Sequence, residues 1–382
     1  MDVAIIGGGI VGCASAYYLR KRGADVTLFE KGSIGNGSTE RSAGGIRCQF
    51  TTPVNVELSK ASIDVWERFE PTFDVDIQYR RNGYLFVGRS EETAELFESN
   101  VETQNRLGVP TELLDAAELR ERFPHLRHQE FTAGTYHAGD GFADPHLALQ
   151  GFAAKAGEIG AEIRTKTPVT DVVRDGEAVT GVVADGERVS ADYVVNAAGP
   201  WAGRVAELAG LSLPVSARRR QVLIADPDGP LPDTAPLTID LETGVYFRPE
   251  REGSVLVGGH FDEKDPEQDP DGYAKSTDLG WTATVLERAS EASSVFGPET
   301  GVKRGWAGLY AVTPDHHPII EESVPGFINA VGFSGHGFQQ APATGRIVTE
   351  LVFEGEASLV DVAPLSGDRF ESDELLEERN VA

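Results

Sequence analysis

Two short apolar runs separated by a glycine-rich turn open the chain. The run at residues 3–6 is continuous, as in a strand buried on both faces of a parallel sheet, and a second run at residues 26–29 ends at Glu30. Between them the pattern predicts a helix over residues 13–22. Because a strand, a tight turn and a helix follow one another so closely, we predict a Rossmann-type turn that binds a dinucleotide.

Three glycines give this turn its expected chemistry. Gly7 allows the tight turn, Gly9 lets the backbone approach a pyrophosphate, and Gly12 lets the helix pack closely on the strand. Ile10 and Val11, just before the helix, belong to the same predicted site, where N–H groups point at the phosphates. The carboxylate that ends the second strand can accept hydrogen bonds from ribose hydroxyls, and it repels the 2′-phosphate of NADP. The turn alone leaves NAD and FAD both open.

The spacing of apolar residues along the chain changes after residue 30 and again near residue 75. A glycine- and serine-rich connection, residues 32–45, precedes a helix predicted over residues 53–69, whose apolar side chains share one face. A strand at residues 83–88 and amphipathic helices near residues 91–107 and 115–122 follow. This change of character indicates an inserted second domain.

The first domain is expected to resume at Asp144, an N-cap followed by proline, which opens a helix to about Gly157. A final strand at residues 326–331 leads into a second glycine-rich junction, with a helix that begins near Pro342. The other expected strands form a meander with Asp-Gly turns, a strand ending in a small-residue turn, and an antiparallel sheet: residues 169–174, 178–184, 188–190, 193–199, 220–225, 244–248 and 254–259.

These elements predict an α/β protein with a discontinuous Rossmann-type domain and an inserted α+β domain that carries a mixed or antiparallel sheet. We assign residues 1–75, 140–215 and 301–382 to the dinucleotide-binding domain. Residues 76–139 and 216–300 form the predicted substrate or catalytic domain. A chain of 382 residues with 40% hydrophobic content is long enough for two such cores.

Acidic residues outnumber basic ones by 61 to 34, which gives a net charge of -27. The excess is spread along the whole chain, as in proteins adapted to high salt, with an ordinary acidic enzyme as the alternative. It argues against a nucleic-acid partner, and we interpret the one dense basic cluster, residues 218–220, as a strand edge or domain interface. Because the first strand begins at residue 3 and no apolar run approaches about 18 residues, we expect a cytoplasmic protein without a membrane span.

The second glycine-rich junction, Gly332-Phe-Ser-Gly-His-Gly-Phe338, favours FAD over NAD. A helix that begins there can aim its N-terminus at the flavin ring and stabilise the negative charge that develops on reduction. An NAD-linked enzyme has no need for such a second junction. The turn near residue 7 would then bind the ADP half of FAD.

Five motifs together resemble the D-amino-acid oxidase superfamily, in its sarcosine oxidase, glycine oxidase, dimethylglycine dehydrogenase and proline dehydrogenase β-subunit branch. They are residues 3–12, Glu30, residues 37–47, residues 196–201 and residues 332–338. The resemblance covers nearly the whole chain and keeps the order of the motifs. It implies an FAD site that includes Gly7, Gly9, Ile10, Val11, Gly12, Glu30, Lys31, Ser38, Thr39, Ser42, Ala43, Gly44, Gly45, Val169, Ala197, Ala198, Gly199, Trp201, Gly308, Gly335, His336, Gly337, Phe338 and Gln339.

The resemblance also implies the oxidation of an amino acid or N-methylated amino acid: sarcosine, dimethylglycine, glycine, proline or a D-amino acid. A hydride passes from the α-carbon to flavin N5, and the resulting imine hydrolyses. Arg47 and Arg248 are the candidates for binding the substrate carboxylate, with a structural salt bridge as the alternative for each. Tyr246 and His260, on neighbouring predicted strands, could line the pocket or simply pack, and His336 lies in the flavin-facing loop.

Departures from the family pattern bear on cofactor attachment and on the electron acceptor. Members with covalent flavin carry a cysteine where this chain has Gly308, so noncovalent FAD is expected. The monomeric oxidases carry lysines after the second junction and in a catalytic strand, where this chain has Gln339 and the lysine-free residues 255–257. A dehydrogenase is therefore favoured over an oxidase. The acceptor (a quinone, an electron-transfer protein or oxygen) stays open, as does membership of a hetero-oligomeric dehydrogenase.

Two other functional classes fit parts of the sequence. A flavin-binding assembly subunit without turnover would carry the same motifs, and an NAD-linked dehydrogenase rests on the first turn alone. His316 and His317 are not expected to bind a metal, because adjacent side chains in extended chain point to opposite faces and no third ligand is suitably spaced. Cys13 and Cys48 provide no disulfide framework, and Cys48 has only Arg47 beside it to activate its thiol.

Overall fold

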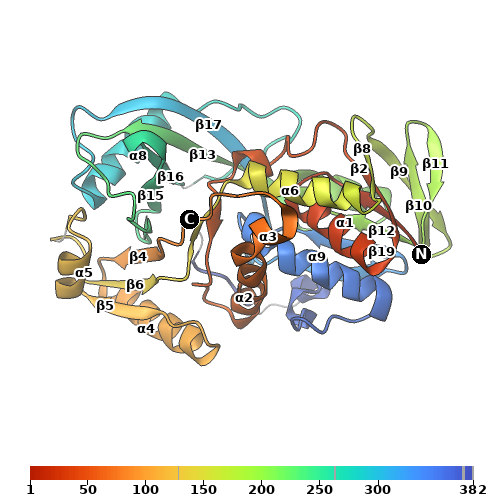
Figure 1. The fold of residues 1–382 in the computed structure, drawn as a ribbon, viewed down its shortest axis with the longest axis horizontal. Helices are drawn as coiled ribbons and strands as arrows, with labels where there is room; N and C mark the ends of the chain where they lie inside the picture. The colour runs from red at the N-terminus through yellow and green to blue at the C-terminus, as the bar shows by residue number, and fades with distance from the viewer. Residues whose placement is uncertain (128, 262–263, 372–374, 381–382) are drawn as a thin grey trace.

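The computed structural model describes residues 1–127, 129–261, 264–371 and 375–380. It has two lobes, each built around one large sheet (Figure 1). The first lobe carries six strands, five of them parallel, with β18 antiparallel at one edge. In spatial order they are β18 (Ile319–Val324), β19 (Phe327–Val331), β12 (Tyr193–Asn196), β1 (Asp2–Ile6), β2 (Asp25–Phe29) and β8 (Glu162–Arg164). This sheet confirms the predicted α/β fold.

Helix α1 (Ile10–Arg22) packs between α6 (Pro145–Glu158) and α9 (Gly337–Glu354), as Figure 1 shows. It begins three residues earlier than predicted, because the N–H of Cys13 already donates to the carbonyl of Gly9 at 2.9 Å. The glycine turn is therefore held at the carboxyl edge of the sheet, which is where open α/β sheets bind their ligands.

Helix α9 begins at Gly337, five residues before the start predicted near Pro342. Proline is normally found in the first turn, because it has no N–H to donate to a preceding carbonyl. Here Pro342 is buried inside the helix, and the packing of α9 against α1 and α2 (Pro53–Glu67) outweighs the lost hydrogen bond. The earlier start brings the helix N-terminus up to the second glycine junction.

The helix predicted over residues 53–69 is divided in two. Helix α2 ends at Glu67, and a short helix, α3 (Phe69–Phe73), follows it. Pro71 explains the break, because its ring would clash with the carbonyl of residue 67 in a continuous helix.

Several local signals predicted the observed structure. The Asp144 side chain accepts hydrogen bonds from the N–H groups of His146 and Leu147 and so caps α6. The predicted meander is present as an antiparallel sheet of three strands: β9 (Val169–Asp175), β10 (Ala178–Ala184) and β11 (Glu187–Ser190). The small-residue turn after β12 becomes a 3-10 helix, η2 (Gly199–Trp201), which leads into α7 (Ala202–Leu208).

The second lobe is built on an eight-stranded mixed sheet. In spatial order its strands are β17 (Gly301–Val312), β13 (Ser216–Asp226), β16 (Val255–Gly259), β15 (Val245–Pro249), β14 (Leu237–Asp240), β4 (Tyr84–Gly88), β6 (Ala133–His137) and β5 (Glu112–Asp115). All neighbours pair antiparallel except β14 and β4. The sequence interpretation placed residues 301–312 in the dinucleotide-binding domain, but these residues form β17 and pair with β13 along its length. The division into domains otherwise stays a prediction.

Among the described residues, three α-helices belong to this lobe, and short elements join the two lobes. The helices are α4 (Glu91–Arg106), α5 (Ala116–Arg122) and α8 (Leu279–Ala292). Strands β3 (Gly45–Ile46) and β7 (Gly141–Phe142) form a two-stranded ladder, and the 3-10 helix η1 (Thr39–Arg41) contacts β17. Within the described ranges, no helix is both long and apolar enough to cross a bilayer.

Candidate cofactor and active site

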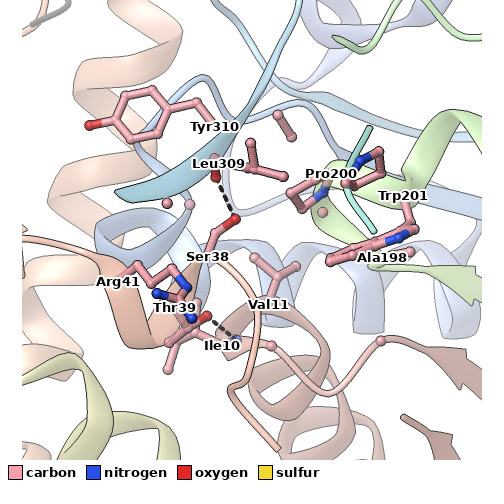
Figure 2. A pocket seen from close by; sticks show the side chains of 18 of the residues that line it. Ile10, Val11, Ser38, Thr39, Arg41, Ala198, Pro200, Trp201, Leu309 and Tyr310 are labelled. Carbon is pink, nitrogen blue, oxygen red and sulfur yellow. Dashed lines mark hydrogen bonds between the residues drawn. The ribbon is translucent and has the colours of Figure 1, made fainter. Parts of the chain in front are cut away.

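Residues from both lobes line one cavity (Figure 2). Most of the predicted cofactor residues lie on its wall, and five do not. The lining ones are Gly7, Gly9, Ile10, Val11, Glu30, Lys31, Ser38, Thr39, Ser42, Ala43, Val169, Ala197, Ala198, Gly199, Trp201, Gly308, Gly335, Gly337 and Phe338. Gly12, Gly44, Gly45, His336 and Gln339 lie outside the wall.

The turn between β1 and α1 forms one end of the cavity. Gly7 has a φ of +116°, and a Cβ atom there would lie 2.4 Å from the carbonyl oxygen of Ala197. A Cβ atom on Gly12 would lie 2.0 Å from the carbonyl oxygen of Gly7. The N–H of Ile10 donates to Thr39 Oγ1 at 3.1 Å, which ties the helix start to the loop opposite (Figure 2). Only a chain without side chains at these glycines can close so tightly.

Glu30 is held at the end of β2 by backbone donors. Its Oε2 accepts from the N–H of Gly8 at 2.8 Å, and its Oε1 accepts from the N–H of Gly32 at 2.7 Å. A carboxylate has about four lone-pair sites, so both oxygens can still accept from ribose hydroxyls in the cavity. The position of Glu30 fits the role predicted for it.

The other end of the cavity lies between β17 and the N-terminus of α9. Ser38 donates through Oγ to the carbonyl of Leu309 at 2.5 Å, so the loop after β2 is fastened to β17 (Figure 2). Gly335 has a φ of +94°, and the ring of Tyr310 lies 2.4 Å from where its Cβ atom would be. Tyr246 lines the same end from β15. The first N–H groups of α9 therefore open onto the cavity, where they can stabilise a developing negative charge.

The structure distinguishes the two arginines predicted to bind a carboxylate, although neither lines the cavity. Arg248 donates to the carbonyl oxygens of Ala43 and Pro249 and forms an ion pair with Glu250 at 3.0 Å. Its charge is therefore already compensated, which is the structural salt bridge named as its alternative role.

Arg47 is buried without an acidic partner. Its guanidinium donates to the carbonyl oxygens of Gln49 and Asn380 and to Nε2 of His336, and it stacks 4.1 Å from the ring centroid of Phe50. Among the residues that the structure describes, no carboxylate lies within 4 Å of it. Glu378 and Asp140 lie near enough to raise the pKa of Arg47 against the larger effect of burial, but neither forms an ion pair with it, so an anion that displaces one of its carbonyl partners can bind there.

His336 is held neutral by its surroundings. A guanidinium can only donate, so the Nε2 of His336, 3.1 Å from Arg47, must accept, and the ring proton lies on Nδ1. Burial lowers the pKa of His336 well below its usual range, and the charge of Arg47 adds to the effect. His260, by contrast, follows the end of β16, faces Asp265 at 3.9 Å and lies outside the cavity wall.

The adjacent histidines, His316 and His317, and the thiol of Cys48 were not expected to carry chemistry, and the structure shows the surroundings of each. His316 has a φ of +62°, so the premise of an extended chain at His316 was wrong. His317 is buried and shares a hydrogen bond with Thr52 Oγ1 at 2.8 Å. Burial raises the pKa of Cys48 well above its usual value, so this thiol stays protonated.

Sequence reasoning missed several polar residues on the cavity wall. They are Arg41, Arg220, Asp271, Tyr273, Lys275 and Tyr310. Arg220 belongs to the basic cluster interpreted as a strand edge or domain interface, and both of its terminal nitrogens bind Asp265 at 2.8 Å. Alternation along β13 could have placed Arg220 on the inner face, but no local pattern marks the loop that carries Asp271.

This loop closes over the cavity from the second lobe. The carboxylate of Asp271 accepts from Lys31 Nζ at 2.5 Å, from Trp201 Nε1 at 3.0 Å and from Arg204 at 2.8 Å. Lys31 Nζ also lies 3.7 Å from the ring centroid of Trp201. All three donors come from the first lobe, so these hydrogen bonds, which we call the Asp271 clasp, join the two lobes.

The residues present fit FAD. At Gly7 and Gly12 no Cβ atom can be accommodated, so the bare backbone of this turn can approach a pyrophosphate. The carboxylate of Glu30 lines the same cavity, where a ribose would lie. A second helix N-terminus faces the far end of the same cavity, as a longer dinucleotide with a redox ring requires. The side-chain nitrogen Nε of Arg41 is also shielded from solvent without a hydrogen-bond partner.

Comparisons with known proteins agree with this site. A family model for FAD dependent oxidoreductases, named DAO, matches residues 2–351. FAD-dependent oxidoreductase domain-containing protein 1 of Bos taurus is 33% identical over an alignment of 421 residues, which covers 97% of this chain and 84% of that protein. Sarcosine oxidase subunit beta of Arthrobacter sp is 27% identical, with 100% of this chain and 94% of the relative covered.

A solved structure shows the same fold over almost the whole chain. The crystal structure of L-proline dehydrogenase from P. horikoshii has a TM-score of 0.89 and 33% identity, and the match covers 98% of each chain. These similarities confirm the family resemblance seen in the sequence motifs. The chain belongs to the DAO family of FAD-dependent oxidoreductases.

Proposed function

We propose that this protein is a dehydrogenase that oxidises an amino acid or N-methylated amino acid at its C–N bond. The observation that carries the proposal is one cavity lined by residues from Glu30 to Tyr246 and Tyr310, with the buried Arg47 beyond its wall, which forms no ion pair among the residues that the structure describes. When bound, FAD supplies the acceptor for a hydride from the substrate α-carbon. The protein's own groups bind the substrate, orient it and exclude water.

Arg47 is the proposed partner of the substrate carboxylate. Its backbone N–H donates to Gln339 Oε1 at 2.8 Å, and its guanidinium contacts His336, so it is attached to the residues that begin α9. A substrate carboxylate would replace the carbonyl oxygen of Asn380 at the guanidinium and form charge-assisted hydrogen bonds. Arg248 is a weaker candidate, because Glu250 already neutralises it.

Tyr246 and Tyr310 form the proposed wall around the substrate. Burial raises the pKa of each phenol, so both remain protonated hydrogen-bond donors and add no negative charge beside a substrate carboxylate. The amine must be uncharged before its α-carbon can lose a hydride. Because His336 is already neutral and accepts from Arg47, it holds its proton on Nδ1 and places no second cation beside that amine.

FAD is proposed to bind noncovalently. The described residues that line the cavity include no cysteine and no histidine, and these are side chains able to form a tether. The stem of Arg41 occupies the space next to Gly308, where a Cβ atom would lie 2.8 Å from Arg41 Cβ. Retention of the cofactor then depends on the backbone turn at Gly7 and Gly12 and on the Asp271 clasp.

Asp271→Asn is expected to release FAD about fivefold faster at low salt. Asparagine keeps the shape of the side chain but removes the negative charge that accepts hydrogen bonds from Lys31, Trp201 and Arg204. Exposed ion pairs of this kind contribute about 1 kcal/mol or less. The measurement is the recovery of flavin fluorescence after dilution, repeated in rising KCl. Added salt should accelerate release from the parent more than from the variant. Asp25→Asn, which breaks the remote Arg20 pair, serves as the control, and equal rates in all three proteins would contradict the clasp.

The preference for an acceptor other than oxygen rests on the absence of a lysine at two positions. Gln339 is buried beside Arg47, and residues 255–257, in the strand comparable to the one that carries an oxygen-activating lysine in the monomeric oxidases, contain no lysine. Lys275 does line the cavity, but it is exposed on the loop near Ala307, to which its carbonyl is hydrogen-bonded. We therefore expect slow reoxidation by oxygen.

One anaerobic experiment tests the proposal. Sarcosine, dimethylglycine, glycine, L-proline and D-alanine are added in turn to the purified yellow protein, and the loss of flavin absorbance is recorded. At least one is expected to bleach the flavin, which should return to the oxidised form faster with an artificial quinone than with oxygen. A yellow protein that none of these compounds bleaches would favour a flavin-binding assembly subunit. Faster reoxidation by oxygen would contradict the dehydrogenase assignment.

A further inference from the structure

Arg41 is the one cavity-lining arginine with no acidic partner among the described residues. Arg41 and Arg220 are the two arginines among the described residues that line the cavity, and Arg220 is bound through two nitrogens to Asp265. Arg41 donates from Nη1 to the carbonyl of Ala307 at a long 3.3 Å, and its Nε is shielded from solvent without any partner. A buried donor left unpaired is destabilising, so an unpaired donor on a cavity wall indicates an acceptor supplied by the ligand.

The contacts of Arg41 place it at the flavin half of the cavity. Its carbonyl accepts from Trp306 Nε1 at 3.1 Å, and its Cβ and Cδ cover Gly308 on the same strand. Two residues further along β17, the ring of Tyr310 packs on Gly335 at the start of α9. Glu30 lies at the other end of the cavity and is fastened by different backbone groups. Figure 2 shows Arg41 beside Ser38 and Thr39.

We propose that Arg41 is a cofactor-positioning residue: its guanidinium donates to the flavin half of FAD and favours the reduced form. This inference rests on the position of the flavin ring under the proposed function, but it does not depend on which amine is the substrate. A flavin gains negative charge on reduction, and a fixed cation in a site shielded from water stabilises that charge more than it stabilises the oxidised ring. Removing the cation should therefore lower the midpoint potential.

The test compares Arg41→Gln and Arg41→Lys in the FAD-loaded protein. Glutamine keeps most of the stem that covers Gly308 but lacks the charge, whereas lysine keeps the charge and loses the planar donor. Arg304→Gln is the matched control, because Arg304 lies exposed on the same strand, outside the cavity wall. Two quantities are measured: the midpoint potential by equilibration with a redox dye, and the dissociation constant of FAD by titration of the apoprotein.

The expected result is a graded loss of preference for reduced FAD. In Arg41→Gln the ratio of affinities for reduced and oxidised FAD should fall about tenfold, which is about 30 mV for a two-electron couple. Arg41→Lys should lie between this variant and the parent, and Arg304→Gln should match the parent. A potential unchanged in Arg41→Gln would overturn the proposal, even if FAD bound less tightly, because the cation would then act on the phosphates. Neither measurement uses an amine substrate, so failure of the proposed amine oxidation would be seen separately.

Discussion

Gly12→Ala is expected to yield a protein that is purified without FAD and is colourless at concentrations at which the parent is yellow. The added Cβ atom would lie 2.0 Å from the carbonyl oxygen of Gly7, which is backbone and cannot rotate away. Either α1 must move off β1 or the turn must open, and both changes misplace the N–H groups that face the pyrophosphate. We expect FAD to bind at least 100-fold more weakly, or about 2.7 kcal/mol.

Gly157→Ala provides the matched control for this substitution. Gly157 lies in α6, no atom lies within 4 Å of the position its Cβ would take, and alanine is the better helix former. This variant should keep its FAD and melt at the same or a higher temperature. Absorbance at the flavin band per mole of purified protein is the measurement. A Gly12→Ala protein with the parent's flavin content would show that the turn does not bind the cofactor.

Arg47→Gln should lower kcat/KM for the substrate found in the anaerobic assay by about 100-fold, with most of the change in KM. Loss of two charge-assisted hydrogen bonds to a carboxylate accounts for about 2.7 kcal/mol of transition-state stabilisation. Glutamine is preferred to alanine because it can still donate to the carbonyl oxygens of Gln49 and Asn380, so the buried segment keeps a partner. The flavin spectrum and FAD content should stay at the parent's values.

Arg248→Gln separates this assignment from its competitor. The pair with Glu250 and the bonds to Ala43 make Arg248 a structural residue, so its replacement should reduce the melting temperature more than it raises KM. A steep rise in KM for Arg248→Gln, together with a parent-like KM for Arg47→Gln, would reverse the two roles. Steady-state kinetics on both variants at one pH decide between these outcomes.

Much of the first lobe could be predicted because its signals are local. The glycines of the first turn, the apolar runs and the Asp144 cap each act within a few residues, and the elements they mark are present. The errors arose where distant packing prevails over a local rule. The start of α9 was misplaced because Pro342 is tolerated inside a helix buried against α1 and α2.

The pairing of β17 was missed for a related reason. Its residues were assigned to the dinucleotide-binding domain, yet they pair along β13, about 85 positions earlier in the chain. No periodicity within a strand states which other strand will become its neighbour, because the choice depends on loop closure and on what the faces bury.

The sequence by itself determined the family, the cofactor class and the two glycine-rich backbone turns proposed to hold FAD, since tight turns and close approaches require glycine at defined spacings. Tertiary structure alone decided which charged groups are compensated and which are free. Glu250 neutralises Arg248, Asp265 neutralises Arg220, and Arg41 lines the cavity with no acidic partner in the part of the chain that the structure describes. The Arg248–Glu250 pair joins near neighbours in the chain, whereas Asp265 lies 45 positions from Arg220 and Arg41 meets Ala307 of β17 from 266 positions away. Only tertiary packing sets the last two distances.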